Sequence, residues 1–242
     1  VIAVGANIKS LHIGDNVFGF SDAGAESQAE YLTATEQDLF PIPEKISYKE
    51  AAASLEGAHY AYSFMHKVDI LPEQNILING ATGGIGSALL QFVKQYDVKI
   101  TATCNTKNIS LIQSLGADKV YDYTQEDFTT DTAQYDFIFD AVGKSTFGKC
   151  KPLLKENGIY ISSELGPYAQ NVFYPLLTSW SSKKVIFPIP FNKSKTIPYI
   201  TARLEQGQFK PVIDREYSLA DISKAYAYVM TGEKTGNVIV NI

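Results

Sequence analysis

The chain has 242 residues, of which 45% are hydrophobic and 19% charged, and its formal net charge at pH 7 is −5. This composition is typical of a folded globular protein with room for one large or two modest cores. The excess of acidic residues disfavours nucleic acid as a partner, because phosphate backbones attract basic surfaces. We found no apolar run long enough to span a bilayer and no signal-peptide pattern at the start, so we expect no membrane partner.

The two cysteines, Cys104 and Cys150, are too few for a disulfide framework. They suit a reducing compartment, and we expect a cytoplasmic protein whose partner is a small molecule. Neither cysteine has a His or an acid placed to activate a nucleophile, so both are assigned to packing.

Residues 1–45 predict short strands in "VIAVG", "NVFGF" and "AEYLTA", separated by turns. Pro41 and Pro43 end this region. From residue 48 to residue 67, alanines and regularly spaced apolar residues predict a helix.

After residue 67, predicted strands and helices alternate. The candidate strands are "NILIN", "KITATC", "KVYDY", "YDFIFDAV", "GIYIS" and "KVIFPI". Their nearly continuous apolarity predicts a doubly wound parallel sheet covered on both faces. At the end of the chain, Ser218 and Asp221 form a capping signature before a helix that should stop at Gly232, and "NVIVNI" predicts a last strand.

A glycine cluster follows the strand "NILIN". The sequence "GATGGIG", residues 80–86, opens a segment whose apolar residues have helical spacing. Glycines in a turn between strand and helix let backbone amides approach a pyrophosphate, and the helix start adds N–H donors. The arrangement therefore predicts dinucleotide binding, with a merely structural turn as the alternative.

The next strand ends in "CNTKN" and not in an acid. A carboxylate at this point would receive the ribose hydroxyls of NAD. Asn105, Thr106 and Lys107 can instead donate to the additional phosphate of NADP, so we expect NADPH as the cofactor. Alternatively, Asn105 caps the following helix and Lys107 is simply solvated.

Two families of dinucleotide enzymes contain such a turn. "NGATGGIG" resembles the short-chain dehydrogenases, but they carry the turn near the start of the chain and use a Tyr-x-x-x-Lys pair. None of the fifteen tyrosines here has a Lys four residues later. We therefore set that family aside.

A second resemblance covers nearly the whole chain. "HIGDNVFGF", "AEYLTATEQDLFPIPEKISYKEAAA", "SLGADKVYDY", "YDFIFDAVGK", "LLKENGIYIS" and "KTGNVIVNI" are similar, in the same order, to the quinone oxidoreductase branch of the medium-chain dehydrogenase/reductases. The resemblance implies an α/β fold, in which a Rossmann doubly wound parallel sheet is joined to a partial GroES-like β-barrel catalytic domain lacking its N-terminal part. The implied domains are 1–47 (barrel part), 48–190 (Rossmann) and 191–242 (return to the catalytic domain).

The resemblance also implies where the cofactor lies. Its pyrophosphate would lie along Thr82, Gly83, Gly84 and Ile85; its adenosine phosphate among Asn105, Thr106, Lys107 and Tyr123; its ribose beside Val142 and Gly143; and its nicotinamide near Glu164, Leu165 and Gly166. For Tyr123 and Val142, packing on the sheet is the alternative.

The four-cysteine loop of the zinc-dependent relatives is absent, and Glu56 is the one residue near an expected ligand position. We expect no metal, and hence hydride transfer from NADPH to a quinone or an α,β-unsaturated carbonyl. His59 and Tyr60 are pocket candidates, with packing as the alternative for His59. A non-catalytic NADPH-binding module and a zinc-dependent alcohol dehydrogenase are the alternative functions. The prolines of "KKVIFPIPF" suit an edge strand, and the resemblance implies that such edges pair to form a homodimer.

Overall fold

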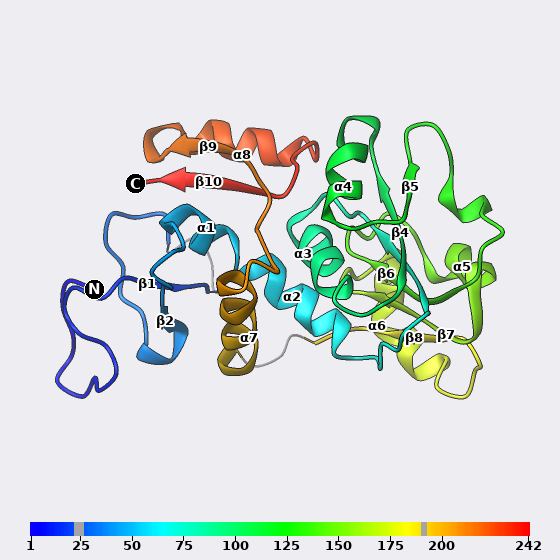
Figure 1. The fold of residues 1–242 in the computed structure, drawn as a ribbon, viewed down its shortest axis with the longest axis horizontal. Coiled ribbons are helices and arrows are strands. Elements are labelled where there is room, and N and C mark those ends of the chain that lie inside the picture. The colour runs from blue at the N-terminus through cyan, green and yellow to red at the C-terminus, as the bar shows by residue number, and fades with distance from the viewer. Residues whose placement is uncertain (22–26, 190–192) are drawn as a thin grey trace. The chain divides into compact units, whose positions relative to one another are not determined.

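The computed structural model describes residues 1–21, 27–189 and 193–242 (Figure 1). The chain forms two compact units, one built from residues 1–56 and 192–242 and the other from residues 57–191. The domain boundaries at 47/48 and 190/191 stay predictions.

The second unit contains a six-stranded parallel sheet in the order β5-β4-β3-β6-β7-β8. Its strands are β3 (Asn75–Asn79), β4 (Lys99–Cys104), β5 (Lys119–Asp122), β6 (Tyr135–Asp140), β7 (Leu154–Ser162) and β8 (Lys184–Ile186). Its helices are α2 (Glu56–Met65), α3 (Gly84–Val93), α4 (Ile109–Leu115), α5 (Phe147–Cys150) and α6 (Gln170–Leu177). The six predicted strands and the Rossmann topology are thus confirmed.

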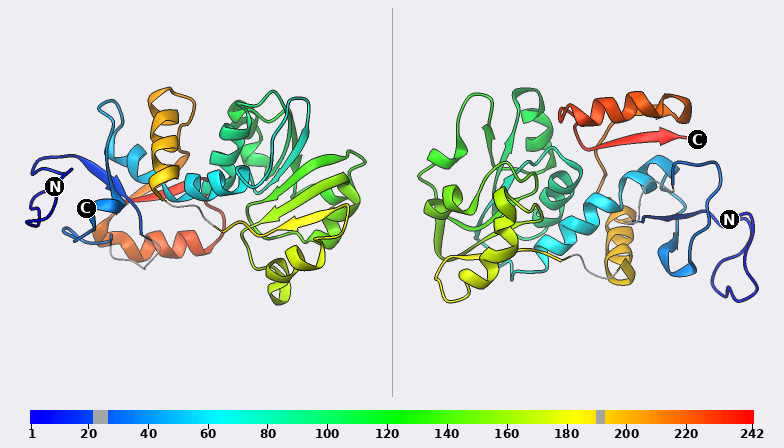
Figure 2. Two further views of the ribbon diagram at one scale, coloured as in Figure 1. Left: turned by 90° about the horizontal axis from the view of Figure 1, so that it is seen from below. Right: turned by 180° about the vertical axis from the view of Figure 1, so that it is seen from behind.

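Alternation along the strands divides the core between the two faces of this sheet. Leu77, Ile138 and Tyr160 pack in one cluster with Phe147 of α5. On the opposite face, the ring of Phe139 lies 6.1 Å from that of Phe64 in α2. Helices therefore cover both faces, as Figure 2 shows from two further sides, and this explains the nearly continuous apolarity of the strands.

Strand β8 forms one edge of this sheet. Part of the predicted edge segment, residues 190–191, lies outside the described residues. Phe173, Leu176 and Trp180, in and after the neighbouring helix α6, are mostly exposed. Dimerisation along this edge stays a prediction.

The first unit contains two separate two-stranded sheets. Strands β1 (Val17–Gly19) and β2 (Leu39–Pro41) are antiparallel, whereas β9 (Ile213–Ser218) and β10 (Asn237–Asn241) are parallel. Its helices are α1 (Tyr48–Ala53), α7 (Lys193–Glu205) and α8 (Ile222–Met230). Strand β10 and helix α8, which is followed by Gly232 at φ +71°, were predicted.

Several local predictions for this unit were wrong. Residues 1–5 and 29–34 are not strands, because neither segment finds a ladder partner among the described residues. The predicted helix 48–67 is two helices, since α1 ends where the hydroxyl of Ser54 donates to the carbonyl oxygen of Ala51 at 2.8 Å. Ser218 makes no side-chain cap; its hydroxyl donates to Asp221 at 3.0 Å.

None of the helices in the described ranges combines the length and the apolarity needed to cross a bilayer.

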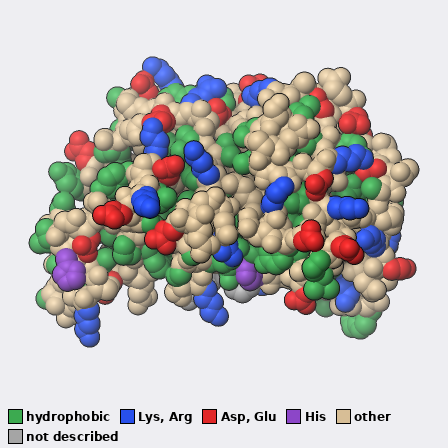
Figure 3. Space-filling model, in the orientation of Figure 1, with side chains coloured by type: hydrophobic (Ala, Val, Ile, Leu, Met, Phe, Trp, Pro, Cys, Tyr) green, Lys and Arg blue, Asp and Glu red, His purple; other side chains and the backbone are tan. Residues whose placement is uncertain are grey.

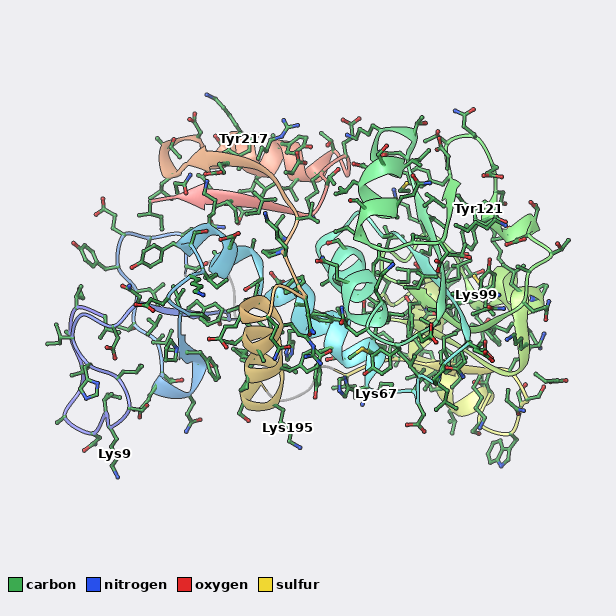
Figure 4. All side chains as sticks on the ribbon, in the orientation of Figure 1. Lys9, Lys67, Lys99, Tyr121, Lys195 and Tyr217 are labelled. Atoms are coloured by element: carbon green, nitrogen blue, oxygen red, sulfur yellow. The ribbon has the colours of Figure 1, made fainter. Side chains whose placement is uncertain are left out.

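A buried carboxylate holds the loop after β5. The Asp131 side chain accepts a hydrogen bond from the Tyr135 hydroxyl at 2.7 Å and lies 3.4 Å from the Lys119 ammonium. Burial by itself would raise the pKa of Asp131, but hydrogen bonds from Tyr121 (labelled in Figure 4) and Tyr135 outweigh it and hold this pKa far below its usual range. The ionised form of Asp131 therefore stabilises the fold.

We expect Asp131→Asn to lower the free energy of unfolding at pH 7 by about 1–3 kcal/mol, because a charged acceptor is lost. The pKa of Asp131 is depressed in the folded state, so its contribution is full above the unfolded pKa of about 4 and disappears as the pH falls through the folded value. The difference between the two proteins should shrink in acid. Urea unfolding from pH 7 to pH 3 measures it, with Glu126→Gln, an exposed acid of the same loop, as the control. A constant difference over this pH range would contradict the assignment.

Candidate functional site at the carboxyl edge of the sheet

The carboxyl ends of the six parallel strands lie along one edge of the sheet. The chain runs outward from β3 through β4 to β5 on one side, and from β6 through β7 to β8 on the other. The order therefore reverses between β3 and β6. Open parallel sheets bind ligands beyond this edge at such a reversal point.

The glycine turn connects β3 to α3 at this reversal point. Gly80 has φ +81°, which a glycine adopts without strain, and Gly83 occupies the N-cap of α3 without a side-chain cap. The first N–H groups of a helix have no partner within the helix. Thr82, Gly83, Gly84 and Ile85 are partly exposed, whereas the rest of α3 is buried. The turn thus presents backbone donors and a helix dipole toward solvent.

Close backbone contacts explain the glycines. A Cβ added to Gly86 would lie 2.2 Å from the carbonyl oxygen of Gly80, and one added to Gly80 would lie 2.7 Å from the Cβ of Val142. A Cβ on Gly57, in α2, would lie 2.6 Å from the carbonyl carbon of Gly84. Larger residues would push the helix or the next loop away from the turn.

The residues predicted for the adenosine phosphate lie beyond β4 and β5. Asn105, Thr106 and Lys107 follow β4 and are partly or fully exposed, and Tyr123, 54% exposed, follows β5. Asn105 stands at an N-cap position but makes no side-chain cap; its Oδ1 accepts from Asn108 Nδ2 at 2.7 Å. The alternative that its side chain caps the helix was therefore wrong.

The sequence-based prediction for these residues missed a neighbouring acid, Asp122. Asp122, the last residue of β5, pairs in register with Cys104, the last residue of β4. Its carboxylate accepts hydrogen bonds from the hydroxyls of Thr106 and Thr124. The segment "CNTKN" itself has no acid, but the neighbouring strand supplies one. The motif "KVYDY" and the parallel register together could have indicated it.

A second missed acid, Asp140, ends β6 and is fully buried. Oδ1 of Asp140 accepts from Asn79 Nδ2 at 3.0 Å and from the Gly143 amide at 2.9 Å, and Oδ2 accepts from the Tyr160 hydroxyl at 2.7 Å. The amides of Val142 and Ser145 add longer contacts of 3.3 and 3.4 Å. This carboxylate therefore fixes the backbone of residues 142–145 beside the glycine turn.

The hydrogen bonds continue from Asp140 toward β4. Thr103 Oγ1 donates to Asn79 Oδ1 at 2.7 Å and accepts from the Gly80 amide at 2.9 Å. One buried polar chain thus crosses β4, β3, β6 and β7 directly beneath the glycine turn. We name the side chains of Thr103, Asn79, Asp140 and Tyr160 the edge network.

The predicted nicotinamide segment follows β7. A Cβ added to Gly143, at φ +63°, would lie 2.5 Å from the Cβ of Glu164, so the loops after β6 and β7 touch. The carbonyl oxygen of Glu164 accepts from Asn171 Nδ2 at 2.8 Å. Glu164 and Leu165 are exposed, and Gly166 has φ +69°.

The pocket candidates in α2 differ in exposure. His59 is 2% exposed and Tyr60 is partly exposed, with their rings 5.8 Å apart. Of the two, only Tyr60 reaches solvent. Burial, with a smaller contribution from the charge of Asp122, raises the pKa of Cys104 to about 11, and burial raises the pKa of Cys150 to about 12. Both thiols are therefore protonated at neutral pH, as expected of packing residues.

Two further observations concern charge. Figure 3 shows acidic and basic side chains interspersed on one face. Among residues 1–21, 27–189 and 193–242, no three His, Cys, Asp or Glu side chains come together as metal ligands.

The fold defines the class: the second unit is a Rossmann-type α/β unit with a glycine turn at its reversal point. Comparison with known proteins gives the family. A model of the family described as "Zinc-binding dehydrogenase" matches residues 115–240.

Curated relatives match almost the whole chain. A chloroplast envelope quinone oxidoreductase homolog of Arabidopsis thaliana is 30% identical over 99% of this chain and 76% of its own length. A 2-methylene-furan-3-one reductase of Solanum lycopersicum is 32% identical over 100% of this chain and 61% of its own. An NADPH-dependent alkenal/one oxidoreductase, chloroplastic, of Arabidopsis thaliana is 31% identical over 99% and 61%. A cytoplasmic location for this chain stays a prediction.

Solved structures show the same fold. The quinone oxidoreductase of Coxiella burnetii superposes with a TM-score of 0.89 at 21% identity, covering 100% of this chain and 76% of its own. A mycobacterial protein complexed with NADPH gives 0.83 at 20% identity, covering 100% and 80%. The chain belongs to the zinc-binding dehydrogenase family, that is, to the medium-chain dehydrogenase/reductases with quinone oxidoreductase relatives.

We expect Asp140→Asn to destabilise the protein by about 2–3 kcal/mol, because the new amide group turns its own hydrogens toward buried donors. Tyr160→Phe removes a single donor from the same carboxylate and should cost about 1 kcal/mol. Denaturant unfolding of both variants measures this order. A Tyr160→Phe cost equal to or above that of Asp140→Asn would contradict the central role of Asp140.

Proposed function

We propose that this protein is a nicotinamide-dependent oxidoreductase that prefers NADPH and reduces a quinone or an α,β-unsaturated carbonyl without zinc. The observation that carries the proposal is the glycine turn at the reversal point of the sheet, where the loops after β3, β4 and β6 converge within one unit. Membership in the family supports it, as do relatives named quinone oxidoreductase homolog and NADPH-dependent alkenal/one oxidoreductase.

The glycine turn fits a dinucleotide. Gly83 leaves the start of α3 without a side-chain cap, so its N–H groups can donate to a pyrophosphate, and the helix dipole favours the negative charge. Thr82, Gly83, Gly84 and Ile85 form the cradle. A Cβ at Gly86 would collide with Gly80, so the third glycine keeps the cradle close to the sheet.

We assign the adenosine end of the cofactor to the loops after β4 and β5. Lys107 supplies the positive charge for a 2′-phosphate, Asn105 supplies an amide donor, and Tyr123 supplies an exposed ring. Thr106 lies between the first two of these residues in the chain, and its hydroxyl donates a hydrogen bond to Asp122. The preference for NADPH over NADH rests on Lys107, because a ribose without phosphate gains little from a cation.

Toward the other end, Val142 and Gly143 would lie beside the ribose. Their backbone is fixed by Asp140, so this part of the site is preorganised before the cofactor binds. Glu164, Leu165 and Gly166 would border the nicotinamide, and Tyr60 is the partly exposed pocket candidate in α2.

The reduced nicotinamide, when bound, supplies a hydride. The residues of this chain have to hold its ring against the acceptor and to exclude water. An electron-poor quinone or enal accepts hydride at carbon or oxygen and takes up a proton from water, so it needs no Lewis acid. An alcohol, in contrast, has no easy route to the alkoxide without one.

We expect Lys107→Ala to weaken NADPH binding about fivefold to tenfold, because a charge-assisted contact with the phosphate is lost, while NADH binding changes little. Titration followed by nicotinamide fluorescence measures both. The control is Lys99→Ala, which removes an exposed lysine from the amino end of the same strand, β4. Equal losses for the two cofactors would contradict the assignment of Lys107.

The proposed reaction also predicts a metal-independent activity. Protein treated with a chelator should oxidise NADPH in the presence of 1,4-benzoquinone or an enal as fast as untreated protein. Loss of turnover on chelation, restored by zinc together with alcohol oxidation, would favour a zinc-dependent alcohol dehydrogenase. Cofactor binding without turnover of any acceptor would favour a non-catalytic NADPH-binding module.

A further inference from the structure

A carboxylate lies beside the loops after β4 and β5, which we assign to the adenosine phosphate. Asp122 ends β5 beside the end of β4, and the residue is 8% exposed. Hydrogen bonds from Thr106 and Thr124 hold the pKa of Asp122 below its usual range, so the group is ionised at neutral pH. A phosphate bound next to Thr106 would therefore meet a fixed negative charge.

The hydroxyls around this carboxylate donate their hydrogens to it. Thr106 Oγ1 donates to one carboxylate oxygen, and Thr124 donates to the other through its hydroxyl at 2.6 Å and its amide at 2.9 Å. A threonine hydroxyl has one hydrogen and two lone pairs. The two Oγ1 atoms lie 3.2 Å apart, and even if one donated to the other, both hydrogens would stay within the group.

The hydroxyl of Thr106 consequently presents lone pairs, and no hydrogen, to a bound ligand. Lone pairs suit the hydroxyls of an unmodified ribose, which donate, whereas a 2′-phosphate needs donors. Lys107 and the amide of Asn105 favour the phosphate, and Asp122 with its two threonines opposes it. The two sets of groups lie within four residues of the ends of adjacent strands.

We propose that Asp122 is a specificity-determining residue that limits the preference for NADPH and keeps NADH a usable cofactor. This inference rests on the proposed function, because it concerns the same site. It makes cofactor choice depend on a balance between Lys107 and Asp122 and not on the absence of an acid after β4.

The chain contains a matched control for this residue. Asp127 accepts hydrogen bonds from the amide and the hydroxyl of Thr129, at 2.9 and 2.8 Å, in the same arrangement as Asp122 with Thr124. It belongs to the loop before the 3-10 helix η3 (Phe128–Thr130) and not to a strand end. Asp127→Asn thus removes one charge from the same kind of Asp–Thr turn, outside the proposed site.

The test measures the dissociation constants of NADPH and NADH for the full chain at one pH and one ionic strength. Asp122→Asn should raise the preference for NADPH, the ratio of the NADH constant to the NADPH constant, about fivefold, because repulsion of the phosphate is relieved. Asp127→Asn should leave this ratio unchanged. Competition by adenosine 2′-phosphate against adenosine 5′-phosphate checks that the change arises at the adenosine end.

A second variant tests the opposite direction. Thr124→Val removes one donor from Asp122 and leaves its charge less neutralised, so the preference for NADPH should fall about twofold. This prediction holds even if Asp122→Asn fails to fold. An unchanged ratio in folded Asp122→Asn, or in Thr124→Val, would overturn this inference but not the proposed function. An equal shift of the ratio in Asp127→Asn would do the same. Wild-type protein that binds neither cofactor would overturn the proposed function and this inference with it.

Discussion

The buried carboxylate of Asp140 is the contact on which the carboxyl edge of the sheet depends. It collects hydrogen bonds from β3, from β7 and from the loop that follows β6. A buried carboxylate is costly unless neighbouring donors satisfy it, and here several donors converge on its two oxygens. The loops that would surround a cofactor are therefore tied together by the requirement to satisfy one charge.

In this arrangement, one set of residues stabilises the site and another set can contact a ligand. The edge network lies beneath the glycine turn and has buried side chains, whereas Thr82 to Ile85 above it are partly exposed. The buried edge network thus holds in place the residues that can contact a ligand. Functional sites commonly combine exposed binding groups with a fully satisfied buried layer that fixes their positions.

The N-terminal region shows where sequence patterns were insufficient. The segments at residues 1–5 and 29–34 have strand-like residues but form no strand, while Leu39–Pro41, a short segment ending in proline, does. A strand needs a neighbour for its backbone groups, and local propensity cannot supply one. In the second unit, by contrast, each predicted strand lies between others or beside one, and all six formed.

The sequence alone determined the alternation of strands and helices and the glycine turn, because apolar periodicity and glycine spacing are local properties. It indicated the family through the resemblance of several motifs in the same order. It also indicated Asn105, Thr106 and Lys107, since they directly follow a strand. Only the tertiary structure placed Asp122 beside Thr106, and Asp140 beside Asn79 and Tyr160. These contacts depend on the order and register of parallel strands, which bring together residues 16 to 61 positions apart, and no local pattern carries that information.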